Sequence, residues 1–410
     1  MTERISRLPN GLTVATDFVP AARSVAMGVW VAVGSRDEPA ELSGVSHFLE
    51  HLLFKGTETR TATDISRAVD RVGGDINAFT SKEYTAYYCR MPRRHGATGV
   101  ELLGDVLTHS LLDDEDVESE RQVILEELAM DDDAPDDVAL RTLTRQVFGD
   151  HGLGRDTAGG RSTVRSIRAS NVRDFFGDHY RTGATTVTVA GDVDHDEVVA
   201  AVDAAFADMP GGDGRVARQA PGDPDVDVSI DDDSEQVHLA IGGRSVARED
   251  PDREALDVVN HVFGGGLSSR LFDEIRERRG LAYSVYSATS AYADAGAWSV
   301  YAGAMPEHAS DVSRLVDQEL TRLVEDGVTD EELTVAIGYL TGAYEMGLED
   351  TGARMSRLGG MLATMGRVIP VDEQLERWEK VSHADVRRVI DRVYGAGRPV
   401  TVLVGPMYSS

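Results

Sequence analysis

The stretch TTVTVAG at residues 185–191 recurs 214 residues later as VTVLVG at residues 400–405. Each is a short run rich in β-branched residues that ends at a glycine, which is typical of a buried strand. The same shift relates further pairs in the same order: Met91-Pro92 and Met305-Pro306, Val172-Arg173 and Val386-Arg387, Tyr180 and Tyr394. So many ordered matches at one spacing indicate a chain built from two copies of one unit.

Each copy mixes strands with longer helices. Residues 84–90 and 297–304 alternate like strands, whereas the stretches 97–121 and 309–333 have helical periodicity and match at a shift of 212 residues. The strands come in consecutive blocks separated by helical segments. This order favours an α+β fold of two duplicated domains, each a mainly antiparallel sheet covered by helices.

The domain boundaries follow from composition. A chain of 410 residues is long enough for two domains. Between the copies lies MPGGDGRVARQAPGDPDVDV, residues 209–228, which is rich in Gly, Pro and Asp and has no helical periodicity. We therefore expect domains at 1–212 and 231–410, joined by a linker at 213–230.

The charge is strongly negative. There are 41 Lys and Arg against 71 Asp and Glu, a net charge of −30, so a nucleic-acid partner is not expected. Only Lys55, Lys82 and Lys380 are lysines. An acidic, lysine-poor surface suits a cytoplasm at molar salt, and we interpret it as halophilic. An ordinary acidic enzyme from a GC-rich genome is the alternative.

The chain shows no sign of export. Its single cysteine, Cys89, has nothing to pair with, which fits a reducing compartment. The longest apolar block, residues 25–33, has the length of a strand and not of a membrane span. The first residues lack the apolar core of a signal peptide. We expect a cytoplasmic protein without a membrane partner.

A metal-ligand motif lies in the first copy. His47 and His51 are four residues apart in the helical stretch GVSHFLEHLLF, residues 44–54, so both imidazoles project from one helix face. Glu50 lies on the same side and is free to carry a proton. The order is the inverse of the H-E-x-x-H zinc motif. The alternative is a helix whose histidines merely face solvent.

A third ligand is expected downstream. The helical stretch ESERQVILEELAM, residues 118–130, carries Glu120 and Glu127 seven residues apart and hence on nearly the same face. A catalytic zinc site needs such a third protein ligand and an open position for water.

These residues resemble the inverted-motif zinc peptidases of the pitrilysin, insulin-degrading enzyme and mitochondrial processing peptidase family, in its short two-domain form. In that family H-x-x-E-H is followed 76 residues later by a ligand Glu in a segment like the ERQVILEE that ends at Glu127 here. The resemblance implies that His47, His51 and Glu127 bind one Zn2+ and that Glu50 is the general base. Glu120 would brace the site.

The resemblance also implies a place for substrate. GGDINAFT, residues 73–80, is similar to the family's substrate-edge segment, in which Asn77, Ala78 and Phe79 would meet an extended peptide.

In the second copy, Arg276 and Tyr283 match an Arg and a Tyr that the family keeps seven residues apart. They would bind a peptide carbonyl and stabilise an oxyanion. A surface arginine and a half-buried strand tyrosine are the alternative for this pair.

The second copy lacks the metal ligands. Residues 259–263, which include His261, stand at the position of the motif, and Tyr339 stands opposite Glu127. One zinc per chain is therefore expected.

The expected function is a zinc endopeptidase that cleaves peptides or unfolded segments. Family members of this length pair two chains, so we expect a homodimer in which Arg276 and Tyr283 act in trans. A catalytically silent scaffold or partner subunit of the same fold is the alternative, and a zinc hydrolase acting on other bonds is a third.

Overall fold

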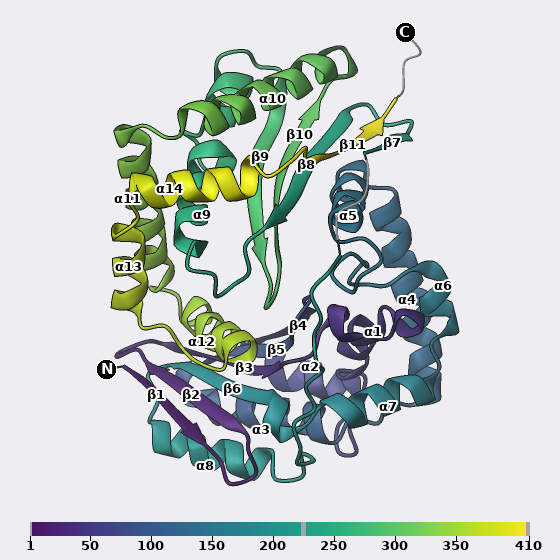
Figure 1. The fold of residues 1–410 in the computed structure, drawn as a ribbon. Helices are drawn as coiled ribbons and strands as arrows, with labels where there is room; N and C mark the ends of the chain where they lie inside the picture. Colours follow the sequence, from purple (N-terminus) through teal and green to yellow (C-terminus); the bar gives the residue numbers. More distant parts are fainter. Residues whose placement is uncertain (1, 223–226, 407–410) are drawn as a thin grey trace. The chain divides into compact units, whose positions relative to one another are not determined.

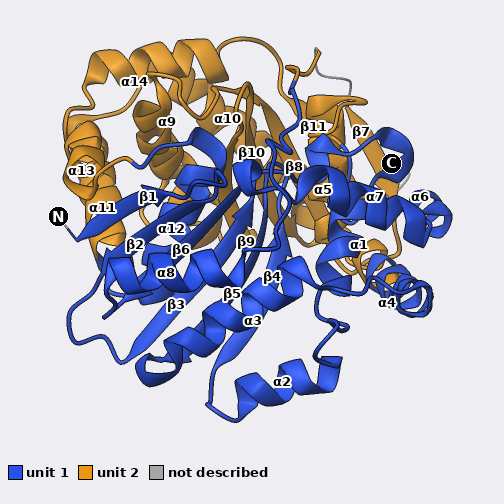
Figure 2. Cartoon of the chain, turned by 90° about the horizontal axis from the view of Figure 1, so that it is seen from below, with its two compact units in different colours: residues 1–128, 155–218, 346–368 blue, residues 129–154, 219–345, 369–410 orange. Residues whose placement is uncertain are grey.

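The computed structural model describes residues 2–222 and 227–406. The chain forms two compact units (Figure 2): unit 1 comprises residues 1–128, 155–218 and 346–368, and unit 2 comprises residues 129–154, 219–345 and 369–410. Each unit has one sheet with helices on both faces, so the expected α+β fold of two duplicated, sheet-and-helix domains is confirmed.

Unit 1 is built on a six-stranded sheet in the order β1-β2-β6-β3-β5-β4 (Figure 1). All neighbouring strands are antiparallel except β2 and β6, which run parallel. The strands are β1 (Glu3–Arg7), β2 (Thr13–Phe18), β3 (Ser24–Val31), β4 (Asp75–Thr80), β5 (Thr85–Pro92) and β6 (Thr185–Gly191). Strand β4 lies at an edge, which leaves one side of its backbone without a neighbouring strand.

The helices of unit 1 cover this sheet. They are α1 (Val45–Leu52), α2 (Ala62–Asp70), α3 (Gly96–Thr108), α4 (Asp114–Asp132), α6 (Arg161–Ser166), α7 (Ala169–His179), α8 (His195–Ala205) and α12 (Thr351–Met365). Alternation along β3 divides its side chains between two cores. Val25, Met27 and Val29 pack into the large core beneath α1, α3 and α8, whereas Ala26 and Trp30 pack against α12.

Helix α12 comes from the second copy of the sequence, yet it packs against β3 and β6 of unit 1. The approach is close, because a Cβ added to Gly359 would collide with the indole of Trp30. Trp30 donates its Nε1–H to Thr188 Oγ1 across 2.8 Å, and that hydroxyl lies 3.2 Å from the Met355 carbonyl oxygen. These contacts attach α12 to the sheet by both packing and hydrogen bonds.

Unit 2 has a five-stranded sheet in the order β7-β11-β8-β10-β9. Strands β7 and β11 are parallel, and the other pairs are antiparallel. The strands are β7 (Val228–Asp231), β8 (Val237–Ser245), β9 (Ala282–Ala291), β10 (Gly296–Ala304) and β11 (Val400–Gly405). Since β6 and β11 are the two copies of the repeated stretch, the order matches that of unit 1 without β1.

The helices of unit 2 are α5 (Pro135–Phe148), α9 (Arg253–Asn260), α10 (Ala309–Asp326), α11 (Asp330–Gly347), α13 (Val371–Glu379) and α14 (His383–Val389). Helix α5 comes from the first copy but packs on β11 and β8 of unit 2, where Leu143 and Phe148 are buried. The 214-residue shift relates α5 to α12. The two copies therefore exchange equivalent helices.

Because of this exchange, neither unit is contiguous in sequence, and the expected boundaries at 212 and 231 describe only the main part of each unit. The expected linker also ends earlier than residue 230. Strand β7 begins at Val228, because residues 228–231 alternate between half-buried and exposed side chains and pair in parallel with β11. Residues 223–226 of that linker lie outside the described residues.

The helical stretches expected at 97–121 and 309–333 are each two helices. The first is interrupted between α3 and α4, where Leu112 has φ 50°, and the second at Gly327, with φ 72°. Positive φ is incompatible with a continuing right-handed helix. Among the described residues, none of the helices combines the length and the apolar composition that crossing a bilayer would require.

Candidate metal centre

Helix α1 presents the two histidines on one face because its opposite face is core. Phe48, Leu49 and Leu52 are fully buried, whereas His47 and His51 keep partial exposure. The helix begins after Gly44, whose φ of 98° is accessible chiefly to glycine.

The free N–H groups at this helix end have a side-chain acceptor. The carboxyl group of Glu38 lies 2.7 Å from the N–H of Gly44 and 2.7 Å from that of Ser46, one on each oxygen. Burial raises the pKa of Glu38 to about 7, against the effect of these two N–H groups. Glu38 thus fixes the start of the helix that carries the motif.

Helix α4 brings the third ligand to the histidines. Ile124 and Leu128 bury one face of the helix, and Glu120 and Glu127 lie two turns apart on the side toward α1. The two carboxylates differ in environment, since the side chain of Glu127 is 42% exposed and that of Glu120 only 4%. The more accessible glutamate is the one that meets both histidines.

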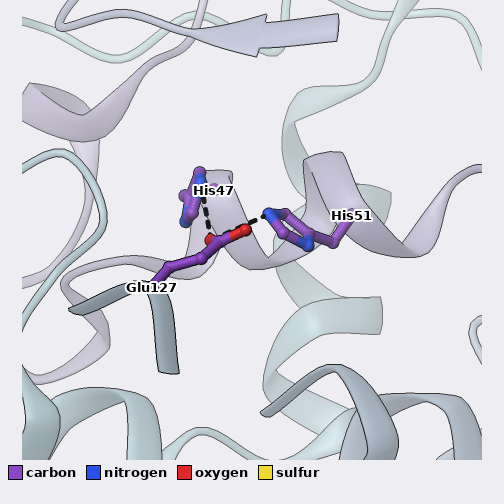
Figure 3. Close-up of side chains that lie close together, drawn as sticks. All are labelled: His47, His51 and Glu127. Carbon is purple, nitrogen blue, oxygen red and sulfur yellow. Dashed lines mark ion pairs between the residues drawn. The ribbon is translucent and has the colours of Figure 1, made fainter. Parts of the chain in front are cut away.

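The three expected ligands converge (Figure 3). Glu127 Oε2 lies 3.5 Å from His51 Nε2 and 3.9 Å from His47 Nε2. The two imidazole rings are 4.7 Å apart at nearly perpendicular planes. Within residues 2–222 and 227–406, these are the residues that form a group of three or more potential metal ligands, with all ligand atoms within 4.8 Å of one another.

This group fits zinc by its donor chemistry. Two imidazole nitrogens and one carboxylate oxygen are the set that catalytic zinc sites use while keeping a position open. Burial, and then the neighbouring His51, lower the pKa of His47 to about 4, so its ring is neutral near pH 7 and has a lone pair to donate. Among the described residues, His47 Nδ1 is buried and has no hydrogen-bond partner.

His51 is oriented by a second carboxylate. Its Nδ1 lies 3.1 Å from Glu120 Oε2, an arrangement in which Nδ1–H donates and Nε2 keeps its lone pair toward Glu127. Lys55, which lies just beyond the end of α1, forms an ion pair with the other oxygen of Glu120. The buried charge of Glu120 is thereby compensated.

Lys55 was missed by the sequence reasoning. The signal that could have found it is its position, four residues after His51, in a chain with only three lysines.

Glu50 points to the same region without belonging to the ligand group. Its Oε2 accepts a 2.6 Å hydrogen bond from Thr80 Oγ1, at the end of β4. Burial is the largest influence on Glu50 and raises the pKa of its carboxyl group. A raised pKa suits a group that must take and return a proton. Thr80 stood in the quoted substrate-edge segment but was not singled out.

The expected substrate residues lie on the edge strand β4. Asn77 and Phe79 are exposed, and Ala78 between them is half-buried on the opposite face. Asn77 Oδ1 accepts a hydrogen bond of 2.8 Å from the Ala78 N–H, and the Phe79 ring packs edge-on against Trp30. These residues are presented at an unpaired sheet edge, as strand addition would require.

Arg276 and Tyr283 lie together in unit 2. Arg276 belongs to the short helical segment Phe272–Glu277, and its guanidinium carbon lies 4.8 Å from the centre of the Phe272 ring and 5.0 Å from that of Tyr283. Tyr283, near the start of β9, is 80% exposed. Tyr283 is thus an exposed strand residue and not a half-buried one, and its ring lies beside the Arg276 guanidinium.

The second copy holds an aromatic pair where the first holds ligands. His261 stacks on Tyr339 with ring centres 4.2 Å apart. Burial lowers the pKa of His261, so it is a neutral, packed ring.

Among the described residues, only one of the two duplicated α+β units carries a His–His–Glu group, which is a donor set that catalytic zinc sites use. The chain belongs to peptidase family M16, the insulinase family. Residues 13–161 match the family model for insulinase (peptidase family M16), and residues 166–340 match that for the peptidase M16 inactive domain.

Several relatives match this chain over nearly its whole length. An uncharacterized zinc protease from Streptomyces coelicolor is 44% identical, over 99% of this chain and 90% of its own length. An uncharacterized zinc protease from Mycobacterium tuberculosis is 42% identical, over 97% of this chain and 92% of its own length. One from Bacillus subtilis is 34% identical, over 95% of this chain and 93% of its own length.

Solved structures share the fold. A peptidase M16 inactive domain from Pseudomonas fluorescens has a TM-score of 0.92 at 19% identity, over 100% of this chain and 99% of that one. A protease from Helicobacter pylori also has a TM-score of 0.92, at 22% identity, over 98% of this chain and 99% of that one.

Proposed function

We propose that this protein is a zinc-dependent endopeptidase that hydrolyses peptides or unfolded polypeptide segments. The observation that carries the proposal is the convergence of His47 and His51 of α1 with Glu127 of α4, while the carboxylate of Glu50 lies outside this group on α1. The zinc-protease names of the relatives support it.

Each residue then has a part. When bound by His47, His51 and Glu127, zinc supplies Lewis-acid polarisation and acidifies water to a pKa of about 7. Glu50 accepts the proton of the attacking water and returns it to the leaving amine. Glu120 keeps His51 in the tautomer that can ligate.

Substrate would bind at the edge of the first sheet. A peptide in extended conformation would add to β4 along Asn77, Ala78 and Phe79, using its backbone for binding. To do so it must compete with the Asn77 side chain, which already accepts a hydrogen bond from the Ala78 N–H. Backbone recognition suits a peptidase that accepts many sequences in unfolded segments.

The proposal includes a homodimer that holds one zinc per chain and shares its sites. Arg276 and Tyr283 of one chain would act on the peptide at the zinc centre of the other, the arginine on a carbonyl and the tyrosine on the developing oxyanion. The exposure of Tyr283 beside the Arg276 cation supports their availability. A cytoplasmic location and adaptation to high salt stay predictions from composition.

The test is hydrolysis of a quenched fluorescent peptide library in molar KCl by the wild type and by Glu50→Gln, with zinc per chain measured for both. We expect the wild type to hydrolyse peptides, and Glu50→Gln to keep its zinc and lose about 100- to 10,000-fold in rate. Zinc without hydrolysis in the wild type would instead favour the catalytically silent scaffold. Hydrolysis unaffected by Glu50→Gln would remove Glu50 from the mechanism.

A further inference from the structure

The proposed base has one fixed hydrogen-bonding neighbour. Thr80 Oγ1 donates to Glu50 Oε2 at 2.6 Å, a short distance that fits a hydroxyl donating to a carboxylate. Among the described residues, Thr80 is the residue that forms hydrogen bonds with the Glu50 side chain. Without it, a glutamate with several rotatable bonds would sample many orientations.

The donor itself is held by the sheet. Thr80 is the last residue of β4 and pairs with Thr85 of β5. The turn that follows is closed by a hydrogen bond from Ser81 N–H to the Tyr84 carbonyl oxygen, and the Ser81 carbonyl oxygen accepts from Ser35 N–H at 3.0 Å. A β-branched side chain on such a backbone has few rotamers, so the hydroxyl has a defined position.

The same strand carries the proposed substrate edge. Alternation places Ile76, Ala78 and Thr80 on the face toward α1, whose contacts with β4 include the bond to Glu50. Thr80 therefore lies two positions after Ala78, which is at the middle of that edge. A peptide added to β4 and the base held by Thr80 would therefore both be positioned by the backbone of the same strand.

We propose that Thr80 is a positioning residue, which orients Glu50 for proton transfer and aligns it with a peptide on β4. This inference rests on the proposed peptidase function. It predicts that loss of the hydroxyl lowers the chemical rate while zinc binding and substrate binding are kept, because the Thr80 hydroxyl bonds to Glu50 and its side chain lies on the face of β4 toward α1.

The test compares Thr80→Val, which keeps the shape and removes the donor, with Thr80→Ser, which keeps the donor. Thr85→Val is the matched control, since Thr85 pairs with Thr80 on β5 and its hydroxyl donates to the main-chain carbonyl oxygen of Val33 at 3.1 Å instead of to Glu50. We expect Thr80→Val to lower kcat about 10- to 100-fold with KM and zinc content unchanged. Thr80→Ser and Thr85→Val should stay within about threefold of wild type in kcat.

A second readout needs no activity. In zinc-free protein, Thr80→Val should lower the urea midpoint of unfolding in the wild-type background and change it much less in a Glu50→Ala background, because the partner of the hydroxyl is then gone. Equal midpoint shifts in both backgrounds, or a kcat for Thr80→Val equal to that of wild type, would overturn the proposal.

The two proposals fail in different ways. A wild type that binds zinc but hydrolyses no peptide would overturn the peptidase function and, with it, the positioning role of Thr80. A wild type that is active alongside a fully active Thr80→Val would overturn only the role of Thr80.

Discussion

His51 and Glu120 face each other across 3.1 Å, from imidazole Nδ1 to carboxylate Oε2, and they come from different helices. Glu120 is buried and does not belong to the ligand group, so its contact with the metal site runs through His51. Experiments can therefore distinguish the proposed binding of the metal by His51 from the orientation of His51 by Glu120.

Glu120→Gln should therefore weaken zinc binding about 10- to 100-fold without abolishing it, because a neutral amide orients His51 less well and leaves Lys55 without its partner. Competition with a chromophoric chelator measures the affinity. Glu118→Gln is the control on the same helix, since Glu118 is exposed and pairs with Arg121. Equal zinc affinities for the two variants would contradict the orienting role.

The attachment of α12 can be tested with two neighbouring glycines. Gly359→Ala should destabilise the protein by about 1–3 kcal/mol, because the new methyl group would collide with Trp30. Gly360→Ala meets no atom within 4 Å and should be neutral or stabilising by about 0.5–1 kcal/mol through helix propensity. Urea denaturation of both variants in the same salt gives the comparison, and similar midpoints would argue against tight packing of α12.

Glu38 predicts a pH dependence of stability. Its pKa is raised from 4.5 to about 7 in the folded protein, so between these pH values the folded state holds more protons than the unfolded state. Stability contributed by the protonated group is complete below pH 4.5 and is lost as pH rises through 7.

Glu38→Gln, which resembles the protonated form, should therefore gain stability relative to wild type as pH rises from 4.5 to 7. Urea midpoints measured at several pH values test this difference. A constant difference would mean that the N–H groups of Gly44 and Ser46 keep Glu38 ionised throughout.

The proposed sharing of sites between chains can be tested by complementation. Glu50→Gln homodimers lack the base, and Tyr283→Phe homodimers lack the tyrosine hydroxyl. After the two are mixed and allowed to exchange subunits, each heterodimer would hold one complete site if Tyr283 acts in trans, and peptide hydrolysis should rise well above that of either parent. No gain in activity, despite heterodimers shown by native mass spectrometry, would place the tyrosine in cis or outside the mechanism.

Much of the site could be predicted from the sequence because it depends on the spacing of residues within single helices. His47 and His51 share a face through the helical period alone, and Glu120 and Glu127 do so in the same way. What spacing could not supply was the pairing of the two helices, which the resemblance to a family provided and which the structure displays as a group within 4.8 Å.

The duplicated fold was also visible in the sequence, since the repeated strands that became β6 and β11 occupy equivalent places in their sheets. The exchange of α5 and α12 was not. Both helices are amphipathic, and periodicity states that a helix has an apolar face without stating which sheet will cover it.

The sequence by itself determined which residues are candidate metal ligands and that the chain is made of two copies, because both are properties of residue type and of spacing along the chain. Only the tertiary structure decided that Thr80 holds Glu50, that Lys55 compensates Glu120, and that each sheet is covered by a helix of the other copy. The residues in each of these pairs are brought together by the packing of whole helices and strands. That packing is favourable because it buries apolar side chains on both faces of each sheet.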